Sequence, residues 1–503
     1  MANILFDTIL GSVAEPEKVC MEVPGGRSVT YAALLEETGR AANALQKLGV
    51  KPGDRIAVQV EKSPEVIALY LGALRAGAVF LPLNTAYTPN EVRYFLEDAS
   101  PSLLVCAPGS ALDGAGFVAE LGLAKETLAP DGSGSWTDAV KAAFPDFATV
   151  ARGGSDLAAI LYTSGTTGRA KGAMLSHTNL ASNCVTLALA WRFTSDDVLL
   201  HALPIFHTHG LFVATHLGLM TGASMLFLPR FDGDQVIGLL PRATAMMGVP
   251  TFYTRLLERA DFTADLVRHM RVFISGSAPL LAETHRAFSE RTGHAIVERY
   301  GMTETTMNSS NPYDGDRRAG TVGFPLPGVE IRIADPESGA VLPTGEIGVV
   351  EVKGPNVFQG YWQMPEKTAA EFRPDGFFIT GDLGKFDGEG YLSIVGRGKD
   401  LIISGGFNVY PKEVETEIDQ IEGVVESAVI GLPHPDFGEG VAAVVVTQAG
   451  AQLTEAGIQA RLSERLARFK QPKRVFFVAD LPRNTMGKVQ KNELRTRYAD
   501  TFR

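Results

Sequence analysis

Hydroxyl side chains, glycines and a lysine crowd one short loop that follows the apolar run Leu157–Leu161. The loop reads Thr163-Ser-Gly-Thr-Thr-Gly-Arg-Ala-Lys171. Glycines let backbone N–H groups approach phosphate oxygens, while the hydroxyls add donors and the lysine adds positive charge. The pattern GxxxxGK(S/T) does not fit, because Ala170 stands at its second glycine and Gly172 follows the lysine. The loop therefore predicts a phosphate site of another kind, with a plain surface turn as the alternative.

Carboxylate, hydroxyl and cationic residues recur in four later runs. These are Arg299-Tyr-Gly-Met-Thr-Glu304, Thr380-Gly-Asp382, Gly396-Arg-Gly398 and Pro482-Arg-Asn-Thr-Met-Gly-Lys488. A lone carboxylate suits Mg²⁺, which takes hard oxygen ligands and few of them from protein. Taken singly, the first run would be a helix N-cap, the glycine runs turns and the lysine a solvated side chain.

In this order the five runs resemble the motifs of the adenylate-forming superfamily, which includes acyl-CoA synthetases, peptide-synthetase adenylation domains and luciferases. The similarity extends from Ala76–Asn84 to Lys488, nearly the whole chain. It implies an acyl-CoA ligase that uses ATP, Mg²⁺ and coenzyme A: a carboxylate displaces pyrophosphate from ATP, and the thiol then displaces AMP. We expect a freestanding enzyme, because no carrier segment follows Arg503. A non-catalytic nucleotide-binding protein is the alternative from another class.

The resemblance implies a role for each matching residue. Lys488 neutralises charge that develops between the carboxylate and the α-phosphate. Thr303 contacts phosphate and Glu304 holds Mg²⁺, while Asp382 and Arg397 contact the ribose. The ATP and AMP site comprises Thr163, Ser164, Gly165, Thr166, Thr167, Gly168, Lys171, Ser277, Glu298, Arg299, Tyr300, Thr303, Asp382 and Arg397.

The resemblance also implies a moving C-terminal domain. Lys399 matches the hinge about which that domain swings between two poses. Ser404, Gly405 and Gly406 match the loop that lines the tunnel for the pantetheine arm of coenzyme A. His207 matches the gate between this tunnel and the acid pocket, and we expect it to contact substrate rather than act as a general base. A zinc pair with His209 is disfavoured, because no third ligand has suitable spacing.

The acid is expected to be malonate. A dicarboxylate needs a cation for its distal charge, since an unpaired buried carboxylate is costly. Arg255 is our candidate anchor, because its guanidinium could grip that carboxylate bidentately, and Arg286 is the rival. The pocket segments around these residues resemble those of the malonyl-CoA synthetases. The expected acid-binding set is Arg255, His207, Thr208, His209, Ser277 and Met307.

Two positions bear on selectivity within this set. Thr208 and Met307 fall where the malonyl-CoA synthetases limit substitution at the α-carbon. Thr306 departs from the family pattern, which usually has asparagine or leucine there. Methylmalonate, acetate and propionate therefore remain alternative acids.

The elements that position these motifs follow from hydrophobic periodicity. Helix and strand patterns alternate from Tyr31 to Leu83 and again from Asp197 to Arg259, which indicates two layered α/β subdomains. Short alternating segments between Gly320 and Tyr391 predict a small β-rich subdomain. Mixed patterning then resumes. We therefore expect an α/β protein with a large N-terminal domain over residues 1–398 and a mobile α+β C-terminal domain over residues 399–503.

Bulk composition excludes several classes. The net charge of −11 argues against a general nucleic-acid binder. The three cysteines are far apart and lack CxxC spacing, so neither a disulfide framework nor a zinc knuckle is indicated. No basic leader and no run of roughly 18 apolar residues is present. We expect a cytoplasmic enzyme without membrane or nucleic-acid partners, on which a lysine acetyltransferase could act at Lys488.

Overall fold

A six-stranded sheet carries the phosphate-loop hairpin. The computed structural model describes residues 3–11, 13–163, 170–404, 407–463, 465–484 and 487–502. The strands of this sheet lie in the order β6-β5-β3-β4-β7-β8, parallel except for β8, which closes a hairpin with β7. Their bounds are β3 Arg55–Gln59, β4 Val79–Pro82, β5 Leu103–Cys106, β6 Ala124–Thr127, β7 Leu157–Thr163 and β8 Lys171–Ser176.

A nine-stranded sheet carries most of the remaining motifs. Its order is β15-β14-β13-β12-β11-β9-β10-β1-β2, and the strands from β1 to β13 along this path are parallel. The carboxyl ends of parallel strands share one edge, where open α/β sheets bind ligands. The bounds are β1 Val19–Glu22, β2 Ser28–Thr30, β9 Val198–His201, β10 Ser224–Phe227, β11 Ala245–Gly248, β12 Val272–Ser275, β13 Val297–Met302, β14 Thr306–Ser310 and β15 Phe324–Pro325.

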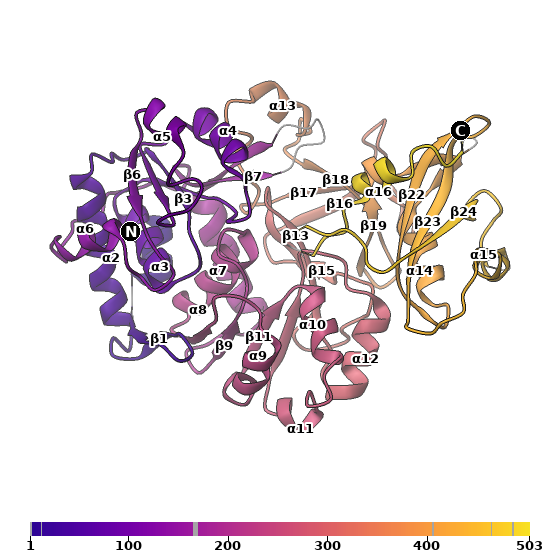
Figure 1. Ribbon diagram of the computed structural model, residues 1–503, viewed down its shortest axis with the longest axis horizontal. Coiled ribbons are helices and arrows are strands. Elements are labelled where there is room, and N and C mark those ends of the chain that lie inside the picture. Colours follow the sequence, from indigo (N-terminus) through magenta and orange to yellow (C-terminus); the bar gives the residue numbers. More distant parts are fainter. Residues whose placement is uncertain are drawn as a thin grey trace.

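Helices cover these two sheets and pack between them (Figure 1). Helix α1 contacts α3, α7 and α8, and the Tyr70 hydroxyl on α3 lies 2.8 Å from Nε2 of His216 on α8, so the two layers share one core. The helices are α1 Ile4–Leu10, α2 Tyr31–Lys47, α3 Pro64–Arg75, α4 Pro89–Ala99, α5 Gly116–Glu120, α6 Ser135–Lys141, α7 His177–Ala190, α8 His216–Met220, α9 Gly233–Leu239, η2 Leu240–Arg242, α10 Pro250–Leu257, α11 Ala264–Val267 and α12 Ala282–Thr292.

The alternating pattern from Asp197 to Arg259 predicts a helix over Gly210–Thr221, but only the second half of this segment is α-helical. A π-helix, η1 His209–Thr215, precedes α8. The Gly210 carbonyl accepts from the Thr215 hydroxyl at 2.9 Å and lies 3.0 Å from Nε2 of His201. Side chains inserted into the helical ladder in this way widen a turn, and such turns recur at functional sites. A Cβ at Gly210 would lie 2.0 Å from the Pro204 carbonyl, so the turn requires glycine.

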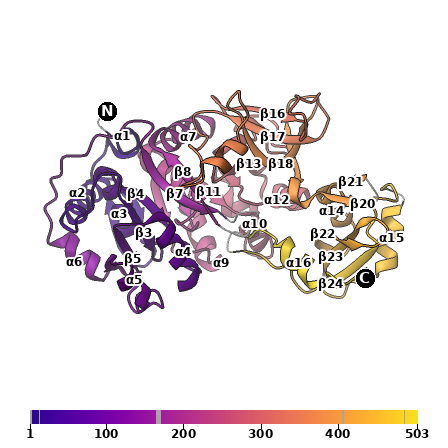
Figure 2. The ribbon, with the colours of Figure 1, turned by 90° about the horizontal axis from the view of Figure 1, so that it is seen from above.

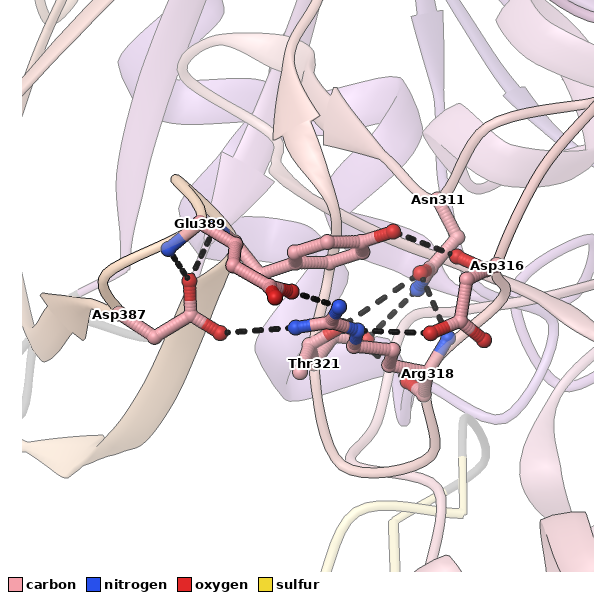
Figure 3. A network of polar contacts seen from close by, with 7 residues as sticks. Asn311, Asp316, Arg318, Thr321, Asp387 and Glu389 are labelled. Atoms are coloured by element: carbon pink, nitrogen blue, oxygen red, sulfur yellow. Dashed lines mark hydrogen bonds and ion pairs between the residues drawn. The ribbon is translucent and has the colours of Figure 1, made fainter.

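The β-rich subdomain is an antiparallel sheet of order β16-β17-β18-β19. Arg318 fastens its outer hairpin to the nine-stranded sheet, as Figure 3 shows: the guanidinium pairs with Asp316 at 2.8 Å, with Asp387 at 3.3 Å and with Glu389. The hairpin that carries Asp382 is thus held in place. The elements are β16 Glu330–Ala334, β17 Gly348–Lys353, α13 Pro365–Ala370, β18 Phe378–Phe386 and β19 Leu392–Arg397.

The C-terminal part lies beside the N-terminal one in both views (Figures 1 and 2). Side chains of β23 alternate between two buried clusters, with Val441 in one and Ala442 in the other, because strands have a period of two. Helices α14 and α15 cover one face and α16 the other. The bounds are η3 Gly398–Asp400, β20 Ile402–Ser404, β21 Phe407–Val409, α14 Pro411–Asp419, β22 Val424–His434, β23 Gly438–Thr447, α15 Glu455–Ser463, β24 Arg474–Val478 and α16 Lys491–Arg497.

The predicted fold class is confirmed: two layered α/β subdomains and a β-rich subdomain precede a small α+β domain. Within the described ranges, no helix combines the length and the apolar character needed to cross a membrane.

Candidate functional site

The expected ribose contacts hold one another. Oδ1 of Asp382 lies 2.6 Å from Nε of Arg397, and the Tyr300 hydroxyl donates to Oδ2 at 2.5 Å. The backbone N–H of Asp382 donates to the Thr380 hydroxyl at 3.0 Å within β18, the strand that pairs with β19. The carboxylate is buried and oriented before a nucleotide arrives. It can therefore accept hydrogen bonds from vicinal hydroxyls.

Glu304 provides the expected carboxylate for Mg²⁺. It is buried, and its backbone carbonyl accepts from the Phe358 N–H at 2.7 Å. Its Oε1 accepts from the Thr163 hydroxyl at 3.4 Å and from the Tyr361 hydroxyl at 3.1 Å. No group of three or more histidine, cysteine or acidic side chains that could hold a metal occurs in the described part of the chain. This donor set fits Mg²⁺, which takes one or two carboxylates and completes its shell with phosphate and water.

Lys171 is the cation at the stem of the phosphate-loop hairpin, opposite Thr163 in the register of β7 and β8. The residue is buried, with Nζ 4.0 Å from the centre of the Tyr361 ring and 3.3 Å from Oε1 of Glu371. Neither Tyr361 nor Glu371 was predicted from the sequence. They come from the segment around α13, far from the loop in sequence, and only backbone pairing between Ala173 and Tyr361 brings them beside it.

Lys488 reaches the same site from the C-terminal domain, in the loop between β24 and α16. Its backbone N–H donates to Oδ1 of Asn484 at 2.9 Å, which tightens the loop. Protein surrounds the ammonium on most sides, although the residue keeps solvent-accessible surface. Burial and the charge of Arg397 lower the pKa of Lys488, while Asp382 and Glu304 act in the opposite direction. The Lys488 ammonium therefore lies close enough to Arg397, Asp382 and Glu304 to interact with their charges.

Arg299 is a buried cation whose donors are not all used. It is 3% exposed, and its Nε and Nη2 atoms have no hydrogen-bond partner among the described residues. A Cβ at Gly276 would lie 2.4 Å from Cζ of Arg299, so the guanidinium rests on the glycine backbone. Burial lowers the pKa of Arg299 to about 9, which leaves it charged at neutral pH. An unpaired buried charge is costly, so this group is built to meet an anion.

Other unsatisfied polar atoms gather near Arg299. The His209 Nδ1 atom lies 3.2 Å from the Ser277 hydroxyl, and Ser277 adopts a φ of 73°. Burial, and the charge of Arg299, lower the pKa of both His207 and His209, to about 3 for His207. Both imidazoles are therefore neutral at physiological pH, and the low pKa makes His207 a weak base there. The buried atoms without a partner in the described residues include His207 Nδ1, Thr208 Oγ1, His209 Nε2 and Ser275 Oγ.

The structure does not bring Arg255 to this cluster. Arg255 is exposed on α10, because Phe252, Tyr253 and Leu256 form the buried face of that helix. It lines a groove of about 510 Å³ shared with the Lys488 loop, including Arg483 and Asn484. The rival, Arg286, is also exposed. Arg299, expected from the resemblance to contact the nucleotide, is the cation that lies among the pocket residues.

Met307 is another expected acid-pocket residue. It is buried on β14, and its backbone N–H and carbonyl are bracketed by the Asn183 amide at 3.3 and 2.9 Å. A Cβ at Gly301 would lie 2.7 Å from its terminal methyl group, so the side chain packs on the glycine of the Tyr-Gly-Met run.

Glu298, another expected nucleotide contact, is a buried carboxyl. Its Oε1 accepts from the Leu280 N–H at 3.2 Å, while Oε2 lacks a partner in the described residues. Burial raises the pKa of Glu298 to about 8. The group is therefore largely protonated at neutral pH and can donate as well as accept a hydrogen bond.

The remaining expected site residues lie in several different elements. Lys399 is exposed in the short turn η3, and Ser404 is buried at the end of β20. Thr303 is half-buried in the turn between β13 and β14. The expected contacts Ser164, Gly165, Thr166, Thr167, Gly168, Gly405 and Gly406 lie outside the described residues.

The chain is similar to several known acyl-CoA ligases. The chain is 37% identical over 481 residues to the feruloyl-CoA synthase of an Amycolatopsis species, covering 94% of this chain and 95% of the relative. It is 35% identical over 494 residues to the malonate–CoA ligase of Arabidopsis thaliana, covering 91% and 80%. The crystal structure of ATP-bound MatB from Rhodopseudomonas palustris superposes with a TM-score of 0.98 at 60% identity, over the full length of both chains.

Family models cover both parts of the chain. The model for the AMP-binding enzymes matches residues 12–362, and the model for the C-terminal domain of AMP-binding enzymes matches residues 413–488. The first match includes the hairpin of Lys171 and the β-rich subdomain up to Trp362, and the second ends at Lys488. The chain belongs to the AMP-binding enzyme family.

Proposed function

We propose that this chain is an AMP-forming ligase that joins malonate to coenzyme A through malonyl-AMP, giving malonyl-CoA, AMP and pyrophosphate. The observation that carries the choice of acid is the buried guanidinium of Arg299, with two donor atoms unsatisfied in the described residues. A monoacid such as acetate would leave this charge unpaired, whereas the distal carboxylate of malonate would neutralise it. The similarity to a malonate–CoA ligase and to MatB supports the same acid.

The first half-reaction joins the acid to the nucleotide. A carboxylate oxygen of malonate attacks the α-phosphorus of ATP, a P–O bond forms and pyrophosphate leaves. Lys488 neutralises the negative charge that builds up between the two anions, and Lys171 binds the phosphates. Asp382 orients the ribose, and Glu304 would hold Mg²⁺, which supplies charge neutralisation on the phosphates when it is bound.

The second half-reaction forms the thioester. The thiolate of coenzyme A attacks the acyl carbon of malonyl-AMP, and AMP leaves with the electron pair of the broken C–O bond. We propose that the chain of residues 399–503 swings about Lys399 between the two steps, and that Ser404 then borders the pantetheine arm. His207 contacts the acyl group as a neutral side chain, since burial holds its pKa near 3.

A panel of acids tests the substrate. Pyrophosphate exchange with ATP is measured for malonate, methylmalonate, succinate, acetate and octanoate in wild type, Arg299→Gln and Arg255→Ala. We expect malonate to be preferred, and Arg299→Gln to lower its kcat/KM by about 100-fold or more, since removing one partner of a buried ion pair costs about 3–5 kcal/mol. Acetate should lose far less. Arg255→Ala is the matched control and should keep the malonate preference.

Two outcomes would contradict the assignment. A preference for a monoacid in wild type would leave the ligase standing and remove malonate. A loss of ATP affinity in Arg299→Gln equal to the loss for malonate would return Arg299 to the nucleotide site.

We also propose that the enzyme works in the cytoplasm and that a lysine acetyltransferase can silence it at Lys488. Acetylation removes the charge that the adenylation step needs. Protein acetylated uniformly at Lys488 should lose pyrophosphate exchange. Unchanged exchange by that protein would exclude this regulation.

A further inference from the structure

One phenol stands between two carboxylates in the phosphate site. The Tyr361 hydroxyl lies 2.7 Å from Oε2 of Glu371 and 3.1 Å from Oε1 of Glu304. The backbone N–H of Tyr361 donates to the Thr368 hydroxyl at 2.9 Å. An antiparallel bridge between Tyr361 and Ala173 holds the Tyr361 backbone beside β8. The phenol therefore cannot move toward one carboxylate without leaving the other.

A tyrosine hydroxyl has a single proton, so Tyr361 donates fully to one carboxylate at a time. The shorter contact is to Glu371. The alternative arrangement is a bifurcated hydrogen bond, in which the Tyr361 hydroxyl donates to both carboxylates at once. A cation bound to Glu304 withdraws electron density from its Oε1 atom, so that this atom accepts the hydrogen bond from Tyr361 less strongly. Tyr361 then donates to Glu371 alone, which lowers the charge density on that carboxylate.

Glu371 holds the lysine of the phosphate loop. Its Oε1 lies 3.3 Å from Nζ of Lys171 and 2.7 Å from Nζ of Lys367, one helical turn earlier. Hydrogen bonds from Lys367 and Tyr361 and the charge of Lys171, acting against burial, lower the pKa of Glu371, so it is ionised at neutral pH. An ionised Glu371 competes with phosphate for the Lys171 ammonium, and anything that weakens Glu371 frees the lysine.

We propose that Tyr361 and Glu371 are positioning residues that couple Mg²⁺ at Glu304 to phosphate binding by Lys171. In the metal-free state Glu371 takes the place of phosphate at the lysine. With a cation at Glu304, the Tyr361 hydroxyl donates its hydrogen bond to Glu371 alone, and the lysine turns to the nucleotide. This inference rests on the proposed roles of Lys171 and Glu304, but it concerns ATP and Mg²⁺ alone and is independent of which acid is used.

The test is the affinity of the full-length enzyme for ATP, measured by titration calorimetry in excess Mg²⁺ and in EDTA, without acid or coenzyme A. The ratio of the two Kd values is the coupling. In Tyr361→Phe we expect the ratio to fall by about fivefold or more, because Kd in Mg²⁺ rises while Kd in EDTA changes little. In Glu371→Gln the ratio should also fall, for the opposite reason: Lys171 is already free, so ATP binds several-fold tighter in EDTA.

Tyr162→Phe is the matched control. Tyr162 lies on β7, in the hairpin that also carries Lys171, and its hydroxyl donates to Oδ2 of Asp98 at 2.5 Å. This is also a tyrosine–carboxylate hydrogen bond, but it does not involve Glu304. Tyr162→Phe should keep the wild-type ratio. Because Tyr361 acts on Lys171 only through Glu371, the double variant should show no larger loss of coupling than the greater single effect.

Three results would overturn the coupling: a wild type that binds ATP equally with and without Mg²⁺, a folded Tyr361→Phe with the wild-type ratio, or a Glu371→Gln that binds metal-free ATP no tighter. If Tyr361→Phe does not fold, as judged by thermal denaturation, Glu371→Gln decides alone. Failure of the malonate assignment would appear in the acid panel and leave this ratio unchanged.

Discussion

Asp382 and Arg397 are joined at 2.6 Å across the paired strands β18 and β19, so the two expected ribose contacts arrive as one unit. The Tyr300 hydroxyl donates a hydrogen bond to the other carboxylate oxygen, Oδ2, at 2.5 Å. Donors on both sides fix the plane of the carboxylate. The orientation that ribose needs is therefore present before ATP binds, which reduces the ordering cost of binding.

Asp382→Asn should weaken ATP binding by about 10- to 100-fold, because a hydrogen bond to a charged group contributes about 1.5–3 kcal/mol and Arg397 loses its partner. Titration calorimetry in Mg²⁺ measures the change. Asp387→Asn is the control: it lies at the far end of the same hairpin, where it pairs with Arg318 (Figure 3). An unchanged Kd in Asp382→Asn would remove Asp382 from the ribose site.

Lys488→Ala should separate the two half-reactions. Pyrophosphate exchange should fall by about 100- to 1,000-fold, the usual effect of removing one group that stabilises developing charge. Thioester formation from synthetic malonyl-AMP should change far less, because Lys488 acts on the α-phosphate. Lys491→Ala, at the start of the neighbouring helix α16 and paired with Glu415, is the control. Equal losses in both half-reactions would contradict the assignment.

The alkaline limb of adenylation should report the charge of Lys488. Burial and Arg397 lower its pKa, so the active ammonium is lost as pH rises through a value below the usual one for lysine. Asp382 acts to raise that pKa, and Asp382→Asn should therefore move the limb to lower pH. Pyrophosphate exchange at saturating ATP, followed across pH 7–11, measures both. A limb that stays in place in Asp382→Asn would show that another group titrates.

The family resemblance named residues that follow two neighbouring strands of the nine-stranded sheet, and sheet geometry explains why such residues belong together. Residues that follow parallel strands meet at one edge, so Thr303 and Glu304 after β13 and Ser277 after β12 had to converge. The ribose pair was equally local, since β18 and β19 form one hairpin. When a motif lies within one hairpin or directly after a strand, local structure is enough to fix the relative positions of its residues.

The acid anchor was harder to predict. Arg255 was chosen from its place on the pocket helix, yet Phe252 and Leu256 already mark the apolar face of α10 at a spacing of four, and Arg255 lies off it. Arg299 sits on β13, which pairs with a strand on each side and is buried on both faces over residues 297–300. That context is the signal that could have identified it as a buried cation.

Contacts between distant segments could not be predicted at all. Glu371 is 200 residues from Lys171 in the chain, and no spacing rule relates them. The π-helical turn at His209 also depends on tertiary contacts, because the side chain of His201 approaches the Gly210 carbonyl from another element. Periodicity alone gives a regular helix there.

Glu298 should make stability depend on pH. Its folded pKa is about 8 against 4.5 for an ordinary glutamate, so the folded state holds a proton that the unfolded state has lost between these values. The free energy of unfolding should fall as pH rises from about 5 to 8. Glu298→Gln should remove this fall and gain at most a few kcal/mol over wild type near pH 8. Denaturant unfolding measures it, with the exposed Glu290→Gln on α12 as control. A gain that did not grow with pH would contradict the shift.

Thr306 holds a strained backbone next to the acid pocket. Its φ is 49°, a left-handed value that is unfavourable for a β-branched residue, and the side chain is buried with its hydroxyl donating to the Thr305 carbonyl at 2.7 Å. Asparagine, one of the two residues that the related family usually has here, adopts this conformation more readily. Thr306→Asn should therefore raise the free energy of unfolding by about 0.5–1 kcal/mol.

Thr306→Val separates backbone strain from the side-chain hydrogen bond. Valine keeps the branched Cβ, and so keeps the strain, but loses the hydroxyl, and it should lower the free energy of unfolding by about 1 kcal/mol. Because Met307 follows directly, relief of the strain should also change the ratio of kcat/KM for malonate and methylmalonate in Thr306→Asn. Denaturant unfolding and the two rates measure these effects. If asparagine destabilised the protein as much as valine, the hydrogen bond rather than the strained φ would govern this position.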